Sequence, residues 1–228
     1  MEIEREHLIT LLYVIISIEL ITAVVGTLYL KKYKDTKLKY FVFFLWYTAI
    51  NEAIGGIYLK RYVNIEWGDL IYNIYYFISF GYLLILYKNH LVNKRNKSLA
   101  YFFLVTYIAL LIINGFYQNY VYELQIIPYI AASCFLVITI SLYFIEILNS
   151  QRVLYVSKNL LFWISIGLLL YHIGNIPFRI LRNYYTDITD ATTAFLLGAF
   201  LTVTMNLSFI FGFIWSSKKQ KYYKKQQY

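Results

Sequence analysis

The residues of this chain with the clearest chemical potential lie in the stretch 158–182, KNLLFWISIGLLLYHIGNIPFRILR. His172, Asn175 and Arg179 are spaced i, i+3, i+7, so they share one face of a helix. The stretch is long and apolar enough to cross a bilayer, where polar and ionisable groups are costly. We therefore expect this face to look inward, toward other helices or a wet cavity. A neutral histidine there is readily switched near neutral pH.

Three further residues fall at mid-depth or in the outer half of other apolar segments: Glu19, Glu52 and Asn73. Together with His172, Asn175 and Arg179 they form the predicted ligand, proton or ion site, a polar pocket in the outer half of the bundle. The alternative is structural, with these side chains hydrogen-bonding from helix to helix and Arg179 reaching the membrane surface. The sequence leaves both interpretations open. Asn73, Tyr76 and Phe80 form a stripe expected to face inward, whereas Glu146 is expected to be a solvated helix end.

The sequence lacks the residues that several kinds of catalytic, metal and cofactor sites require. The one cysteine, Cys134, can form no intramolecular disulfide, and three histidines are too few for a convincing zinc site. No phosphate-binding glycine loop or nucleophile elbow is present. A retinal protein needs a Schiff-base lysine in its last helix, and residues 191–216 contain none. We therefore expect neither a catalytic site nor a metal site nor a cofactor.

The elements that position the polar residues are long apolar segments. The chain is 60% hydrophobic and only 14% charged, which indicates an integral membrane protein. Because a spanning helix needs about 20 apolar residues, the sequence predicts an all-α bundle of seven transmembrane helices at 8–30, 38–59, 69–87, 99–114, 126–148, 159–181 and 191–216. Pro128 falls in a first turn, where proline is tolerated. Pro177 should kink its helix or end it early.

The distribution of basic residues predicts the orientation. The first, third and fifth connections and the tail hold 16 basic residues, and the opposite side holds 5, which are Arg5, Lys60, Arg61, Arg179 and Arg182. The positive-inside rule places the larger group in the cytoplasm. The N-terminus is then outside and the C-terminus cytoplasmic, in agreement with an odd number of spans. We expect a seven-helix domain over 1–216 and a basic cytoplasmic tail over 217–228.

Three phrases carry a resemblance: INEAIGGIY at 50–58, IYNIYYFISFGYLLILYK at 71–88 and LLFWISIGLLLYHIGNIPF at 160–178. They resemble a group of uncharacterised seven-helix inner-membrane proteins of Bacteroidetes, which has no assigned catalytic residues. The resemblance implies a multi-pass protein of a bacterial inner membrane. The chain is also similar in outline to small multispanning accessory proteins of bacterial antiviral systems, including RNA-targeting CRISPR loci.

Two functions remain open. The first is a non-enzymatic sensor or signalling protein that passes a change in the polar pocket to a cytoplasmic protein partner through the basic loops and tail. The second is a transporter or oligomeric pore, as a membrane component of an antiviral system. The bilayer is the expected partner in both cases, and the net charge of +9 is explained by topology and anionic lipid rather than by nucleic acid.

Overall fold

The computed structural model of the protein describes residues 2–55, 65–181 and 188–217, with side chains at 9–55, 69–150, 153–181 and 193–217. Within these ranges every regular element is a helix, which confirms the predicted all-α class. The elements are α1 (Glu2–Leu28), α2 (Leu30–Tyr33), α3 (Lys39–Glu52), α4 (Ile65–His90), α5 (Lys94–Asn114), α6 (Ile126–Leu148), the 3-10 helix η2 (Gln151–Lys158), α7 (Leu160–Leu181) and α8 (Ile188–Trp215).

Six helices of the described chain are long and apolar enough to cross a membrane. By length and composition these are Ile9–Leu28, Asp69–His90, Lys94–Asn114, Ile126–Leu148, Leu160–Leu181 and Thr193–Trp215. They match six of the seven predicted spans, and the bounds of α6 are those predicted. The chain is thus a multi-pass membrane protein in its architecture.

The seventh predicted span, 38–59, is described only in part. It begins with the 14-residue helix α3, which continues as a π-helical turn over residues 53–55. Residues 56–59 lie outside the described residues. At about 1.5 Å per residue, α3 alone is about 21 Å long, which is less than the roughly 30 Å of a hydrocarbon core. A crossing by this segment stays a prediction.

The start of α5 differs from the prediction. Helix α5 begins at Lys94, five residues before the expected start, because the Asn93 side chain caps it by accepting a hydrogen bond from the Arg95 backbone N–H at 2.9 Å. Helix α7 ends at Leu181, as predicted, and contains Pro177, so the proline does not end the helix early. The hydropathy pattern could not locate the start of α5, since its polar first turn lowers the mean hydropathy there.

The chain forms two compact units. The first comprises the described residues of 1–47, 147–174 and 186–228, and the second comprises those of 48–146 and 175–185. Helices α3 and α7 each contribute to both units, which are described separately below.

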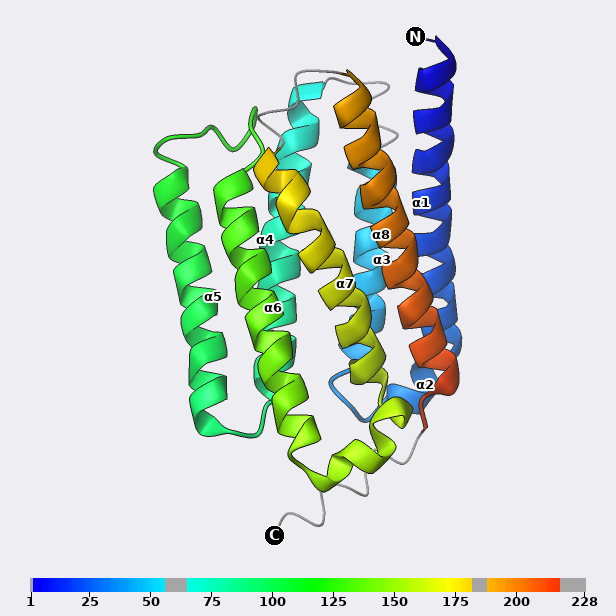
Figure 1. The fold of residues 1–228 in the computed structure, drawn as a ribbon, viewed down its shortest axis with the longest axis vertical. Coiled ribbons are helices and arrows are strands. Elements are labelled where there is room, and N and C mark those ends of the chain that lie inside the picture. The colour runs from blue at the N-terminus through cyan, green and yellow to red at the C-terminus, as the bar shows by residue number, and fades with distance from the viewer. Residues whose placement is uncertain (1, 56–64, 182–187, 218–228) are drawn as a thin grey trace. The chain divides into compact units, whose positions relative to one another are not determined.

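In the first unit, α1 runs along α8 (Figure 1). Aromatic rings join α3 to α8, with the Phe41 ring perpendicular to that of Phe209 at a centroid distance of 5.2 Å. The absence of a side chain at Gly167 lets α7 approach α8 closely, since a Cβ there would lie 2.9 Å from the Met205 carbonyl oxygen. Close helix approach through small residues therefore holds this unit together.

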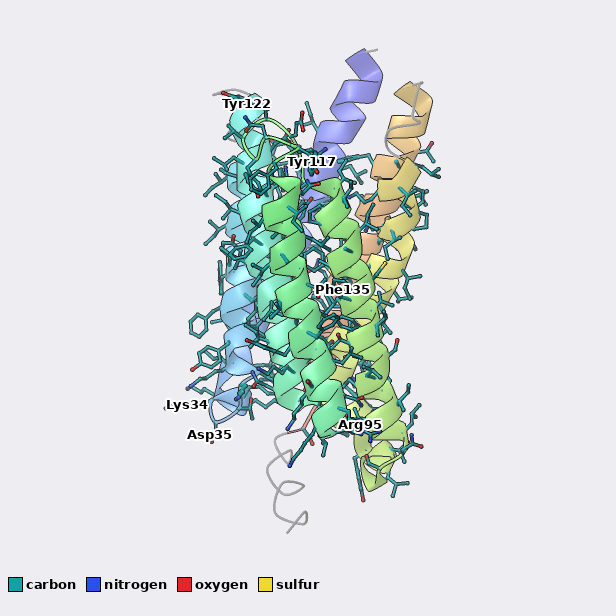
Figure 2. All side chains as sticks on the ribbon, turned by 90° about the vertical axis from the view of Figure 1, so that its left-hand side faces the viewer. Lys34, Asp35, Arg95, Tyr117, Tyr122 and Phe135 are labelled. Atoms are coloured by element: carbon teal, nitrogen blue, oxygen red, sulfur yellow. The ribbon has the colours of Figure 1, made fainter. Side chains whose placement is uncertain are left out.

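In the second unit, α4 packs beside α5, and α6 completes the group (Figure 1). The Phe80 ring of α4 contacts both Tyr107 of α5 and Tyr129 of α6, at centroid distances of 5.6 and 5.4 Å. Figure 2 shows Tyr117 at one end of this unit and Arg95 at the opposite end. The connection from α5 to α6 and the basic turn from α4 to α5 thus mark the two ends.

Candidate functional site

The second unit contains a cluster of tyrosines around one arginine. Arg179 of α7 donates a hydrogen bond from Nη2 to the Tyr76 hydroxyl of α4 at 3.0 Å. Its guanidinium carbon lies 4.7 Å from the centroid of the Tyr129 ring of α6. The Tyr76 and Tyr129 rings are themselves 4.7 Å apart and steeply inclined. A cation over an aromatic face gains about 0.5–2 kcal/mol, so the tyrosines stabilise a charge that hydrocarbon would not.

Glu52 joins this cluster through α4. The Tyr72 hydroxyl donates to the Glu52 carboxylate at 3.1 Å. Tyr72 lies one helical turn before Tyr76, and their ring centroids are 6.3 Å apart. Glu52 at the end of α3 and Arg179 near the end of α7 are therefore connected through Tyr72 and Tyr76, which lie on one face of α4.

Asn73 has a structural role. Its Nδ2 donates to the backbone oxygens of Tyr120 and Glu123 at 2.8 and 2.9 Å, and its Oδ1 accepts from the Gln125 N–H at 3.0 Å. The amide thereby fixes the connection between α5 and α6 onto α4. Asn114 extends this network by donating to Gln125 Oε1 at 2.6 Å.

The remaining predicted site residues are buried. Asn175, on α7 in the second unit, is 7% exposed. Glu19 of α1 and His172 of α7 belong to the first unit and are 7% and 5% exposed. The structure thus brings Glu52, Asn73 and Arg179 to neighbouring positions along α4, with Asn175 one helical turn before Arg179. The six residues are divided between the units, with four in the second and two in the first.

Some of the contributing residues were not singled out from the sequence. Tyr72, Tyr129 and Gln125 carry much of the cluster and its support. Tyr129 follows Pro128 in the first turn of α6. The proline marks the start of that helix, and this position was the sequence signal that could have placed Tyr129 near the Asn73–Tyr76–Phe80 stripe. Nothing local distinguishes Tyr72 among the chain's 26 tyrosines.

The expectation that Glu146 is a solvated helix end is wrong. Its carboxylate accepts hydrogen bonds from the backbone N–H groups of Val92 and Asn93, at 2.6 and 3.1 Å, and from Asn96 Nδ2 at 2.7 Å. The charge compensates the unpaired N–H groups and the positive dipole end at the start of α5. Glu146 therefore fixes the basic turn onto α6.

A second polar arrangement lies at the lysine-rich end of the first unit. Lys32 Nζ donates to the Phe213 carbonyl oxygen at 3.0 Å, and the Tyr33 hydroxyl hydrogen-bonds with Ser216 Oγ. Burial, with the nearby charge of Lys158, lowers the pKa of Lys32. Burial raises the pKa of Tyr33 to about 12, against the effect of the Ser216 hydrogen bond.

The last residue of η2, Lys158, lies at the same end of the first unit. The Ser217 N–H donates to the Lys158 carbonyl oxygen at 3.0 Å, and Lys158 Nζ lies 3.7 Å from the centroid of the Trp215 ring. The first connection, the fifth connection and the end of α8 therefore lie together in this unit. Among the described residues, no three His, Cys, Asp or Glu side chains come together as a metal site.

No protein-family model, no curated protein and no solved structure matches this chain.

Proposed function

We propose that this chain is a seven-helix protein of a bacterial inner membrane, with residues 38–59 as the seventh span. Its N-terminus is outside, and its C-terminus and basic connections are cytoplasmic. The contacts of Lys32, Tyr33 and Lys158 with the end of α8 support this arrangement, because they gather the first and fifth connections at one end of the first unit. The positive-inside rule then assigns that end to the cytoplasm.

The proposed function is that of a non-enzymatic sensor, which detects a ligand in the outer half of the bundle and signals to a cytoplasmic protein. One observation carries the proposal: the Glu52–Tyr72–Tyr76–Arg179 cluster. Asn73, which follows Tyr72, binds the connection between α5 and α6. Tyr117 of that connection lies at the end of the second unit opposite Arg95 (Figure 2). Ionisable groups in membrane helices are costly and usually mark function. The basic turn at the opposite end supplies a charged surface for a partner.

The sensor is tested by comparing transcripts in cells that naturally make the protein. We expect deletion of the gene to change a defined set of transcripts, and the double variant Glu52→Gln with His172→Gln to reproduce that change at normal membrane abundance. Glu123→Gln, which alters an exposed acid of the α5–α6 connection, should behave as wild type. A double variant that is abundant in the membrane and gives the wild-type transcript profile would contradict the sensor.

A transporter or oligomeric pore is the second candidate, including a role in an antiviral system. It is favoured by Pro177, which lies inside α7 two residues before Arg179 and removes one backbone hydrogen-bond donor there. Ion flux from liposomes that contain the purified protein separates the candidates. The sensor predicts a tight membrane, whereas flux that is lost on Arg179→Gln would favour transport.

A further inference from the structure

The buried polar atoms without a hydrogen-bond partner within the described chain include three of the second unit: Asn51 Nδ2, Ser79 Oγ and Tyr129 Oη. Their residues are 9%, 7% and 4% exposed. Buried polar groups nearly always pair with protein, water or ligand, because an unsatisfied group costs roughly 1–3 kcal/mol. Three unsatisfied groups in one unit therefore indicate that a polar molecule belongs among these helices.

These three atoms belong to α3, α4 and α6, which also carry Glu52, Tyr76 and Tyr129 of the cluster around Arg179. Tyr129 packs directly against its guanidinium. Ser79 lies one helical turn after Tyr76, which accepts the Arg179 hydrogen bond, so both lie on the same side of α4. Asn51 immediately precedes Glu52, the acid that α4 binds through Tyr72.

The unsatisfied groups favour an acceptor-rich guest. An amide Nδ2 can only donate, both hydroxyls can donate, and Arg179 adds a positive charge with a planar donor fork that matches a carboxylate. A phosphate dianion fits less well, because a buried double charge would face a single cation in a cluster that already contains Glu52.

We propose that this cluster binds a small carboxylate, with Arg179 as the charged partner and Asn51, Ser79 and Tyr129 as neutral donors. The inference rests on the proposed sensor and names the chemical class of its ligand.

The test is thermal unfolding of the full chain in detergent with sodium formate, acetate, succinate or phosphate, against sodium chloride at equal ionic strength. At about 100 times the dissociation constant, we expect a carboxylate to raise the Tm by roughly 5 °C, in a saturable manner. Arg179→Gln should abolish the rise. Arg95→Gln, which alters an exposed arginine in the first turn of α5, should leave it intact.

Tyr129→Phe keeps the ring and removes only the unsatisfied hydroxyl. In the absence of added carboxylate, we expect this variant to be at least as stable as wild type. Its affinity for the carboxylate should fall on the order of 10-fold, which corresponds to the loss of one hydrogen bond. If no carboxylate raises the wild-type Tm, or if phosphate alone does, the assignment is overturned. An equal rise in Tyr129→Phe, Arg179→Gln and wild type would also overturn it, as an effect of salt.

Failure here is distinguishable from failure of the sensor. Binding is measured on purified protein, whereas the sensor is judged by transcripts. Unaltered transcripts in the double variant with normal carboxylate binding would reject only the sensor. A changed transcript profile without carboxylate binding would reject only the ligand class.

Discussion

At the scale of single residues, the same side-chain type serves different ends in this chain. Asn73 uses both ends of its amide, with three hydrogen bonds to the connection between α5 and α6. Asn51 is equally buried and leaves its Nδ2 unsatisfied. Their hydropathies are identical, so only the partners supplied by other helices separate a structural amide from a candidate binding residue.

Tyr33 provides a prediction about pH. Its raised pKa means that the folded chain keeps the neutral phenol after the unfolded chain has ionised. The stability it contributes is present below pH 10 and is lost as the pH rises toward 12, by roughly 2–3 kcal/mol at most.

In thermal unfolding at pH 8, Tyr33→Phe should be less stable than wild type by about 1 kcal/mol, since the bond to Ser216 is lost. We expect this difference to shrink or reverse between pH 10 and pH 12. Tyr40→Phe, at an exposed tyrosine of α3, should show no such change. A difference that stays constant across this pH range would mean that Tyr33 is not protected from ionisation.

At the scale of elements, local signals predicted helices well and their ends less well. Residues 126–148 were predicted and observed as α6, because a long apolar run bounded by polar residues leaves little choice in a membrane. The start of α5 was placed too late, since Lys94, Arg95 and Lys97 lower the hydropathy of a turn that Asn93 and Glu146 stabilise. Caps and remote carboxylates are invisible to a hydropathy pattern.

Glu146→Ala should loosen the start of α5. The change removes the acceptor of three hydrogen bonds from residues 92–96, at an expected cost of about 1–3 kcal/mol. Hydrogen exchange should become faster in the first turn of α5 and stay unchanged in α8. Glu123→Ala removes an exposed carboxylate and serves as the matched control. Equal exchange in both variants would show that Glu146 does not hold this turn.

The approach of α7 to α8 gives a prediction about packing. In Gly167→Ala the new methyl group would lie 2.9 Å from the Met205 carbonyl oxygen, so the helices must separate, at a cost of about 1–3 kcal/mol. In Gly198→Ala the methyl group meets no atom within 4 Å, and the gain in helix propensity is up to about 1 kcal/mol.

Thermal unfolding in detergent should therefore lower the Tm of Gly167→Ala and leave that of Gly198→Ala unchanged or higher. Equal shifts in the two variants would argue against close packing at Gly167.

At the scale of the whole molecule, the proposed topology depends on the crossing by residues 38–59. If this segment spans, Lys37 and Arg95 lie on the same side, since two helices separate them. If it does not, they lie on opposite sides.

Cysteine labelling in intact cells can decide this, after replacement of the single native cysteine by Cys134→Ala. An impermeant maleimide should label Tyr117→Cys from outside, at a residue that is 83% exposed. Lys37→Cys and Arg95→Cys should react only after the membrane is permeabilised. If Lys37→Cys is labelled from outside and Arg95→Cys is not, residues 38–59 do not cross the membrane. If Arg95→Cys is labelled from outside, the proposed orientation of the second unit is wrong.

The sequence by itself determined the all-helical class and six of the seven predicted spans, which the described residues contain as membrane-length helices. It could do so because the transfer of an apolar segment into hydrocarbon depends on local length and composition. Only the tertiary structure decided what the polar groups do. Tyr76 and Arg179 are 103 residues apart, and Glu146 reaches donors more than 50 residues earlier. Such pairings follow from how the helices pack, and hydrogen bonds over these separations leave no pattern in the local sequence.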